Sequence, residues 1–184
     1  MPGGNKNGFG LLQILITVAI AGLLTSVAVP LLSRRSPADV RKQLAAQLNT
    51  FTQHAWYRAI TTGKTHQVLF DLAKNRIEIL TETDKVNDAG DFIFAPIKQS
   101  YLPNSFTWPS TYQIKQFIIE GVDMLENFGK TNQLWFFIVP QGLAQAVIIN
   151  MVDANDLVGK KPRQIGLVLN PFSAQFKIYD SFQK

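Results

Sequence analysis

The chain has 184 residues, of which 46% are hydrophobic, and its formal net charge is +5. It contains no cysteine, which excludes disulfides, CxxC sites and cysteine nucleophiles. The positive charge is modest and spread along the chain, so the composition does not favour a nucleic-acid-binding protein.

The first element is an apolar run. Residues Phe9 to Leu32 are 24 consecutive residues without a charge, and they follow a short polar stretch, residues 1–8. As a helix the run would be about 36 Å long, whereas the hydrocarbon core of a bilayer is about 30 Å thick. A soluble helix would carry a polar face, but only four scattered residues are polar here: Gln13, Thr17, Thr25 and Ser26. The run predicts a transmembrane helix.

A cleavable secretory signal is the alternative reading of this segment. Such a signal has an apolar run of about 7–15 residues followed by a small-residue cleavage site. Here the run is longer, and Pro30, Leu31 and Leu32 offer no such site. The small residue is Gly8, in front of the run, so that cleavage there would leave Phe9 as the new N-terminus and keep the helix.

Gly8-Phe9 followed by an apolar helix resembles the processing site of type IV pilins and of the pseudopilins of type II secretion. With Phe9 as the first mature residue, Gly22 is the fourteenth and Pro30 the twenty-second, where that family places helix-loosening residues. The resemblance implies that a prepilin peptidase cleaves after Gly8 and methylates the new amine of Phe9. One departure is Gln13, because the family's fifth mature residue is usually Glu.

The departure at Gln13 changes the chemistry of assembly. The resemblance implies that the Glu carboxylate usual at this position attracts the N-terminal ammonium of a neighbouring subunit. Such a charge-assisted hydrogen bond is about twice as strong as a neutral one. Gln13 keeps an acceptor oxygen but loses the charge. Either the ordinary contact is weakened, or the subunit lies near a filament tip, where no subunit ahead must be bound. We favour a minor, tip-proximal subunit.

Orientation in the membrane gives conflicting signals. Lys6 precedes the run, whereas Arg34 and Arg35 follow it, so the positive-inside rule predicts a cytoplasmic C-terminal side. The resemblance implies the opposite: a single-pass protein of the bacterial inner membrane with its C-terminal domain in the periplasm. We follow the resemblance.

Residues 33–63 have the pattern of an amphipathic helix. Ser36 is a plausible N-cap, Pro37 and Asp39 suit the first turn, and Gly63 is a plausible C-terminal stop. The helix either continues the preceding one or is separated from it at Pro37. Its apolar residues form one helical stripe: Val40, Leu44, Leu48, Phe51, Ala55 and Ala59.

After residue 63 the pattern is that of strands, which with the helix predicts an α+β fold. We expect a hairpin of 67–70 and 76–79, a polar loop at 81–91, and strands at 93–100, 105–108 and 112–120. A second hairpin is predicted over 133–153 around Pro140-Gln141-Gly142, with Trp135–Val139 buried on both faces, and a third joins 164–169 to 174–179.

The order of these elements extends the resemblance to the H type of minor pseudopilin. It implies a long N-terminal helix packed on an antiparallel β-sheet domain. The expected division is a leader at 1–8, a transmembrane and filament-core helix at 9–32, an amphipathic helix at 33–63 and a β-rich periplasmic domain at 64–184.

No cofactor or metal site is predicted. Both Gly-Lys-Thr stretches, at 63–65 and 129–131, lack the earlier glycine of a phosphate-binding loop. His54 and His66 lack metal-ligand spacing. The acidic residues Asp84, Asp88 and Asp91 do not follow a calcium-loop pattern, and we interpret them as a solvated loop.

Lys160, Lys161 and Arg163 form a basic cluster that we place in a loop before the last hairpin. It could contact DNA phosphates, as in related minor pilins of the FimT type, but these few cations favour an exposed charged loop.

The sequence therefore predicts a non-enzymatic minor pseudopilin. The expected partners are other pseudopilins, the prepilin peptidase, the inner membrane and the secreted substrate, with no nucleic acid. The alternatives are a DNA-binding minor pilin and a signal-anchored periplasmic enzyme.

Overall fold

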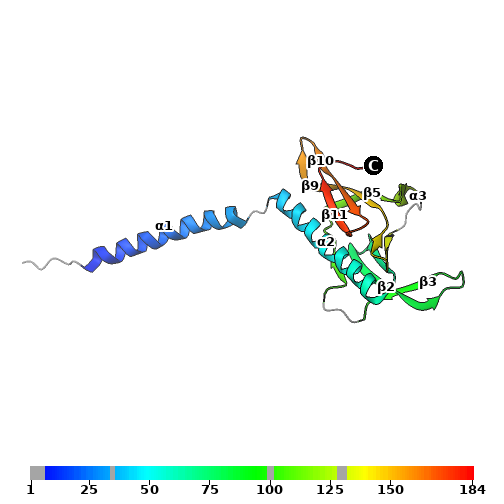
Figure 1. Cartoon of the computed structure of the whole chain (residues 1–184). Helices are drawn as coiled ribbons and strands as arrows, with labels where there is room; N and C mark the ends of the chain where they lie inside the picture. The colour runs from blue at the N-terminus through cyan, green and yellow to red at the C-terminus, as the bar shows by residue number, and fades with distance from the viewer. Residues whose placement is uncertain (1–6, 34–35, 99–101, 128–131) are drawn as a thin grey trace, which may run out of the picture. The chain divides into compact units, whose positions relative to one another are not determined.

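A computed structural model of the chain describes residues 7–33, 36–98, 102–127 and 132–184, except for the side chains at 7–9, 11, 27–33 and 127. The chain divides into two compact units, Met1–Val40 and Arg41–Lys184. Each is described by itself. The second unit holds two antiparallel sheets and most of the helix α2 (Figure 1).

The first sheet has the strand order β3-β2-β1-β7-β8, with β4 also paired to β2, and the second has the order β11-β10-β9-β5-β6. Their strands are β1 (His66–Asp71), β2 (Arg76–Val86), β3 (Phe92–Pro96), β4 (Ser105–Thr107), β5 (Tyr112–Ile119), β6 (Val122–Asp123), β7 (Gln133–Val139), β8 (Leu143–Ala144), β9 (Val147–Val158), β10 (Lys161–Asn170) and β11 (Gln175–Tyr179), and a short helix α3 (Met124–Asn127) follows β6. The α+β class is confirmed.

The two long helices are separate elements, α1 (Asn7–Ser33) and α2 (Pro37–Thr62). Residues 34 and 35, between them, lie outside the described part. The main-chain nitrogen of Ala38 donates to Ser36 Oγ over 3.2 Å, as expected of an N-cap. At the other end, Gly63 has φ +63° and its N–H donates to the Ala59 carbonyl over 3.1 Å. The sequence signals for both ends of α2 are confirmed.

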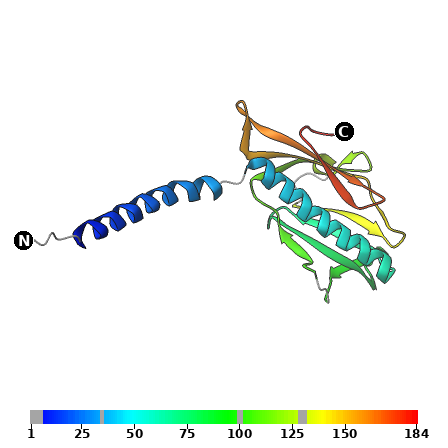
Figure 2. The same ribbon diagram turned by 60° about the vertical axis from the view of Figure 1, so that its left-hand side comes forward.

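The apolar stripe of α2 faces the sheets. Five of its six predicted residues are buried, but Val40 is 37% exposed, and the prediction was wrong there. Two buried residues of α2, Ala45 and Thr52, lie outside that stripe. Figures 1 and 2 both show α2 lying across the strands of the domain. Burial of this stripe holds α2 on the domain: Leu44, Leu48, Phe51, Ala55 and Ala59.

Polar side chains of α2 also bind main-chain groups of the strands. Asn49 Nδ2 donates to the Phe176 carbonyl over 3.1 Å, and the Phe176 nitrogen donates to Asn49 Oδ1 over 2.6 Å. Thr52 Oγ1 donates to the Ala174 carbonyl over 2.7 Å. Because β11 is an edge strand, Asn49 occupies main-chain groups that a further strand would otherwise use.

Aromatic rings join the two sheets. Phe70 of β1 lies 5.2 Å from Phe117 of β5, and Phe136 of β7 lies 6.3 Å from Phe176 of β11, both edge to face between ring centroids. All four rings are buried. The core of the domain therefore lies between the sheets.

Two predicted hairpins are confirmed and the third is confirmed only in part. β1 pairs with β2 from Asp71 opposite Arg76, and β10 pairs with β11 from Asn170 opposite Gln175. The predicted hairpin within 133–153 forms only around its turn, where β7 pairs with β8, because the following strand β9 belongs to the second sheet. The turn at 139–142 instead leads from β7 to the two-residue strand β8, with Gly142 at φ +78°.

Two other expectations about strands are wrong. The expected loop at 81–91 begins only after Val86, because β2 continues through it and pairs with β3. The polar sequence fits this part of β2, because its side chains are half-buried or exposed. In β7 the side chains alternate between buried and exposed, and Trp135 is 41% exposed, so the strand is not buried on both faces.

The last residues of the chain cross the second sheet. The Gln183 nitrogen donates to Oδ1 of the buried Asn150 over 2.9 Å, and Asn150 Nδ2 donates to the Gln183 carbonyl over 2.8 Å. Beneath this segment lies Gly166, where a Cβ atom would come within 2.5 Å of the Ser181 carbonyl oxygen. A glycine at this position leaves room for the crossing.

Candidate assembly site

Helix α1 carries most of the residues expected to act in assembly. Its described large apolar side chains are all exposed by more than half: Leu12, Ile14, Leu15, Ile16, Val18, Ile20, Leu23 and Leu24. They lie on every side of the helix, since their positions are nearly consecutive. A helix that is apolar all round is normally covered by lipid or by other protein.

The hydroxyl groups of α1 are satisfied inside the helix. Thr17 Oγ1 donates to the Gln13 carbonyl over 2.7 Å, Thr25 Oγ1 to Ala21 over 2.5 Å, and Ser26 Oγ to Leu23 over 2.8 Å. In the described part of α1, the side-chain amide of Gln13 is the polar group left without a hydrogen bond. It can therefore both donate to and accept from another molecule.

The other predicted assembly residues also lie on α1. Gly8 and Phe9 are near its beginning, and Pro30 is near its end, although the side chains of Phe9 and Pro30 lie outside the described part. Gly22 is in the interior of the helix, and a Cβ there would meet no atom within 4 Å. These residues are arranged along one helix rather than around a pocket. No helix in the described part of the chain combines the length and the apolarity needed to cross a membrane.

The basic cluster is not in a loop before the last hairpin, as expected, but at the tip of a hairpin. Lys160 is in the turn between β9 and β10, and Lys161 begins β10; both are exposed. Arg163 is in β10, and its Nε lies 2.6 Å from Asp156 Oδ2. Arg163 therefore already has an anionic partner within the chain, whereas no described carboxylate forms an ion pair with either lysine.

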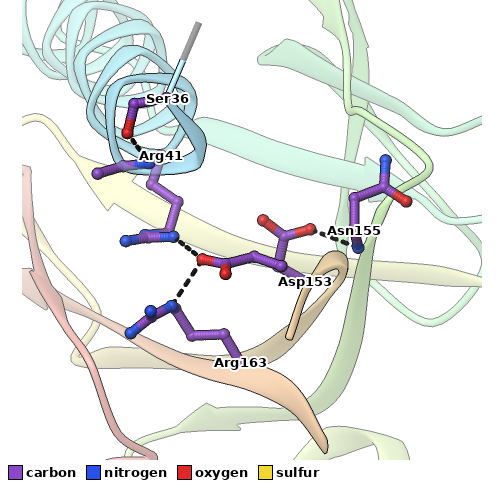
Figure 3. A network of polar contacts seen from close by, with 7 residues as sticks. Ser36, Arg41, Asp153, Asn155 and Arg163 are labelled. Carbon is purple, nitrogen blue, oxygen red and sulfur yellow. Dashed lines mark hydrogen bonds and ion pairs between the residues drawn. The ribbon is translucent and has the colours of Figure 1, made fainter. Parts of the chain in front are cut away.

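Asp156 is the centre of a polar cluster that the sequence did not indicate. Its Oδ2 accepts from Arg163 Nε and also from Nη1 of Arg41, near the beginning of α2 (Figure 3). The hydrogen bond from Arg163 is the main cause that lowers the pKa of Asp156. A register shift between Pro162 and Arg163 interrupts the β9–β10 pairing beside this cluster. The cluster fixes α2 to the hairpin. Arg41 is 115 residues from Asp156, too far for any local motif to show the contact.

Close to the Asp156 cluster, Asp153 is buried and its Oδ1 accepts from the Asn155 nitrogen over 3.0 Å (Figure 3). Burial, followed by the negative charge of Asp153, raises the pKa of Tyr112 to about 12. Tyr112 is therefore neutral at physiological pH, and the group is structural rather than an acid–base pair poised near neutrality.

The two histidines lie at the interface of α2 with the first sheet. His66 is fully buried, its Nδ1 lies 3.0 Å from the Lys64 carbonyl oxygen, and burial lowers its pKa. Burial, followed by the charge of Arg58, also lowers the pKa of His54. Both are expected to be neutral at pH 7, and neither belongs to a metal-ligating group among the described residues.

The three acidic residues are on the β2–β3 hairpin. Asp84 lies 2.8 Å from Lys64 Nζ, and this hydrogen bond is the main cause that lowers the pKa of Asp84. Asp88 and Asp91 are exposed in the connecting turn. Within the described residues, no three of the possible metal ligands come together. Lys64, from the first Gly-Lys-Thr stretch, is in an ion pair; most of the second stretch, residues 129–131, lies outside the described part.

The fold is similar to that of a known pseudopilin. A crystal structure of the minor pseudopilin EpsH from the type II secretion system of Vibrio cholerae matches with a TM-score of 0.53 and 14% identity, over 81% of this chain and 99% of that chain. A second structure of EpsH matches with a TM-score of 0.48 and 14% identity, over 76% and 95%. No model of a protein family matches the sequence, and no curated protein matches it significantly. The predicted resemblance to the H-type pseudopilin is confirmed for the fold.

Proposed function

We propose that the protein is a minor pseudopilin of the H type, a non-enzymatic subunit of the periplasmic pseudopilus of a type II secretion system. One combination carries the proposal: a domain with the EpsH fold follows an uncharged helix whose described apolar side chains are all exposed. The fold alone would suit many roles. The exposed apolar side chains of α1 also require lipid or another protein to cover them, and a pseudopilin would meet that requirement.

In this proposal residues 1–8 are a leader that prepilin peptidase removes, and Phe9 becomes the N-methylated first residue. Residues 9–32 first anchor the subunit in the bacterial inner membrane and then enter the filament core. Residues 33–63 and 64–184 form the periplasmic domain, which contacts other pseudopilins and the exported protein. Growth of the filament would push exported proteins through the outer membrane.

Transfer from lipid to filament needs a driving force other than burial of apolar surface. Lipid and neighbouring helices are about equally apolar, so packing and polar pairing must favour the filament. Gly22 offers a place where another helix can approach closely, because no atom surrounds its Cβ position within 4 Å. Gln13 offers the polar contact, since the hydroxyl groups of Thr17, Thr25 and Ser26 already bind their own helix.

The neutral side chain of Gln13 supports a place near the tip of the pseudopilus. A subunit inside the filament gains from a carboxylate that binds the ammonium of a neighbour. A subunit with no neighbour ahead has no such ammonium to bind, and a buried carboxylate without a partner would be costly. A glutamine avoids that cost.

Mass spectrometry of the native protein tests the proposal directly. The first peptide is expected to begin with N-methylated phenylalanine at position 9, whereas a start at Met1 or beyond Leu32 would refute the assignment. Gly8→Val should block processing, while Gly10→Val, two residues away at a helical glycine whose Cβ position is open, should leave it intact. Deletion of the gene should stop protein export; loss of DNA uptake or twitching alone would favour a type IV pilus.

The second candidate is a minor pilin that binds DNA during transformation, and the exposed lysines at 160 and 161 favour it. Salt-sensitive retention on DNA, lost in Lys160→Ala/Lys161→Ala but kept in the control Lys98→Ala/Lys115→Ala, would support it. Arg163 is unsuited to the test, because its substitution also breaks the contact with Asp156.

A further inference from the structure

The β9–β10 hairpin ends in a basic tip, defined here as residues 157–161. Leu157 is 59% exposed and Val158 is 54% exposed, and the exposed Lys160 and Lys161 follow shortly after them. Cations beside exposed apolar side chains suit the surface of a bilayer, where anionic headgroups lie above the acyl chains. The basic tip therefore has the composition of a membrane-surface contact.

The two lysines of the basic tip form no ion pair with the described carboxylates. The nearest carboxylate in sequence, Asp156, is held by Arg41 and Arg163. In the first turns of α2, the exposed Asp39 and Lys42 carry opposite charges and offset each other. The charge of the tip is therefore available to an anionic partner outside the chain.

Strand β9 directs the basic tip towards the beginning of α2. The strand starts shortly after Gly142, whose carbonyl accepts from Trp56 Nε1 in the second half of α2. Near the other end of β9, Asp156 contacts Arg41 in the first turns of α2. Figures 1 and 2 both show the β9–β10 hairpin near these first turns. Gly159 follows Asp156 by a further length of about 10 Å of extended chain, so the tip projects past Arg41.

The beginning of α2 is also the point from which the chain leads back to α1. Ser33 is the last residue of α1 and Pro37 is the first of α2. The chain between them spans at most about 14 Å, and the helix from Pro37 to Arg41 adds about 6 Å. Arg41 therefore lies within about 20 Å of the end of α1, whatever the angle between the two helices. A tip that projects past Arg41 is within reach of a bilayer that holds α1.

We propose that the basic tip contacts the membrane that holds α1, with its two lysines on anionic phospholipid headgroups and Leu157 and Val158 at the edge of the acyl layer. The inference rests on the proposed function, because it needs α1 in a bilayer, and it adds a second membrane contact to the subunit before assembly. Two lysines and two apolar side chains bind a bilayer only weakly by themselves. The anchor α1 keeps the tip near the surface and so raises its effective concentration there. A contact of this strength can break when the subunit enters the filament, and it requires no neighbouring subunit.

The apolar residues of the basic tip favour lipid over DNA as its ligand. DNA phosphates would bind the two lysines, but they offer no apolar surface to Leu157 and Val158. A bilayer accommodates both kinds of side chain at the same place.

Site-directed labelling of the full-length chain in vesicles tests the contact, because the natural sequence has no cysteine. Leu157→Cys carries an environment-sensitive fluorophore, and the vesicles contain equal parts of phosphatidylglycerol and phosphatidylcholine. We expect blue-shifted emission and strong quenching by spin-labelled lipid. The matched control is Phe172→Cys with the same label, at a residue that is 74% exposed at the opposite end of β10 from the tip. Equal emission and equal quenching of the two probes would overturn the inference.

Removal of charge measures the contribution of the lysines. In the labelled Leu157→Cys chain, Lys160→Gln/Lys161→Gln should lower the ratio of bound to free tip about fivefold for each lysine. Vesicles of phosphatidylcholine alone should weaken the contact in the same way. Lys85→Gln/Lys98→Gln, which removes two exposed charges elsewhere, is the control and should change nothing. Equal quenching in all these samples would overturn the inference.

A DNA-retention assay with the same lysine variant separates lipid from DNA. Retention that needs both lysines, while the probe at residue 157 stays in water in the vesicles, would show that the tip binds DNA and would reject the membrane contact. An N-methylated Phe9 would in that case still support the proposed processing and anchoring, so the two failures are distinguishable.

Discussion

Helices α1 and α2 have nearly the same length, 27 and 26 residues, but opposite surroundings. The described apolar side chains of α1 are exposed, whereas α2 buries one stripe of apolar residues against the sheets of its own chain. The stability of the domain therefore depends on α2, and the environment of α1 must come from other molecules. Substitutions in the two helices should consequently affect different measurements.

The largest effect is expected from Leu48→Ala in α2. Leu48 is fully buried, and loss of a buried leucine side chain costs about 2–5 kcal/mol of unfolding free energy. Leu23→Ala in α1 is the matched control, since Leu23 is 69% exposed. Denaturant unfolding of the full-length chain in detergent should show the loss only for Leu48→Ala. Equal losses would mean that α1 contributes to the fold of the domain.

A smaller effect is expected from Asp156→Asn, which leaves Arg41 and Arg163 facing each other without the shared carboxylate. Loss of hydrogen bonds to a charged group costs about 1.5–3 kcal/mol. Asp88→Asn, at an exposed acidic residue, is the control and should leave the unfolding midpoint unchanged. An unchanged midpoint for Asp156→Asn would show that the cluster does not hold α2.

Asn49→Ala should cost about 1 kcal/mol for each of the two hydrogen bonds it removes from Phe176. It should also leave the edge of β11 open to other strands, so that concentrated protein aggregates more readily. Light scattering and unfolding together measure both effects. The comparison variant is Thr50→Ala, at an exposed residue of α2 whose hydroxyl donates only to the Ala46 carbonyl.

The smallest effect is a gradual loss of stability below neutral pH. The pKa of His66 and that of His54 are lowered from 6.5 in the folded chain, with burial as the main cause. The unfolded chain therefore binds protons first as the pH falls, so the free energy of unfolding decreases from pH 6.5 towards the folded-state pKa values. A pH series of unfolding measurements should become flatter in His54→Gln/His66→Gln. If the free energy of unfolding depends on pH just as steeply in this variant, groups other than these two histidines cause the dependence.

The sequence correctly predicted those parts of the fold that depend on residues close together along the chain. The stripe and both ends of α2 follow from local spacing, Ser36 and Gly63, and the β10–β11 hairpin from its turn residues. The sequence wrongly placed β7 and β9 in one hairpin, because apolar spacing shows that a strand is buried but not which sheet it joins. Pairing with distant strands, of β7 with β1 and of β9 with β5, decides the sheet to which each belongs.

The candidate site likewise has a part that the sequence indicated and a part that only the structure reveals. The residues on α1, such as Gln13 and Gly22, could be proposed from the sequence because they occupy positions that the resembled family marks in its apolar helix. The Asp156 cluster was not, because Arg41 and Asp156 are 115 residues apart and meet only after the domain folds. The role of Arg163 was misjudged although Asp156 is near it in sequence, because the two side chains meet only through the pairing of β9 with β10.

The bidentate contact of Asn49 with Phe176 also limits how the domain can be isolated. A fragment that begins at residue 64 would lose α2, uncover the apolar faces beneath it and free the main-chain groups of β11. Such a fragment should be insoluble, however complete its strands. A useful expression boundary lies at Ser36, where the N-cap, the Arg41 contact and the edge cover of β11 are all retained.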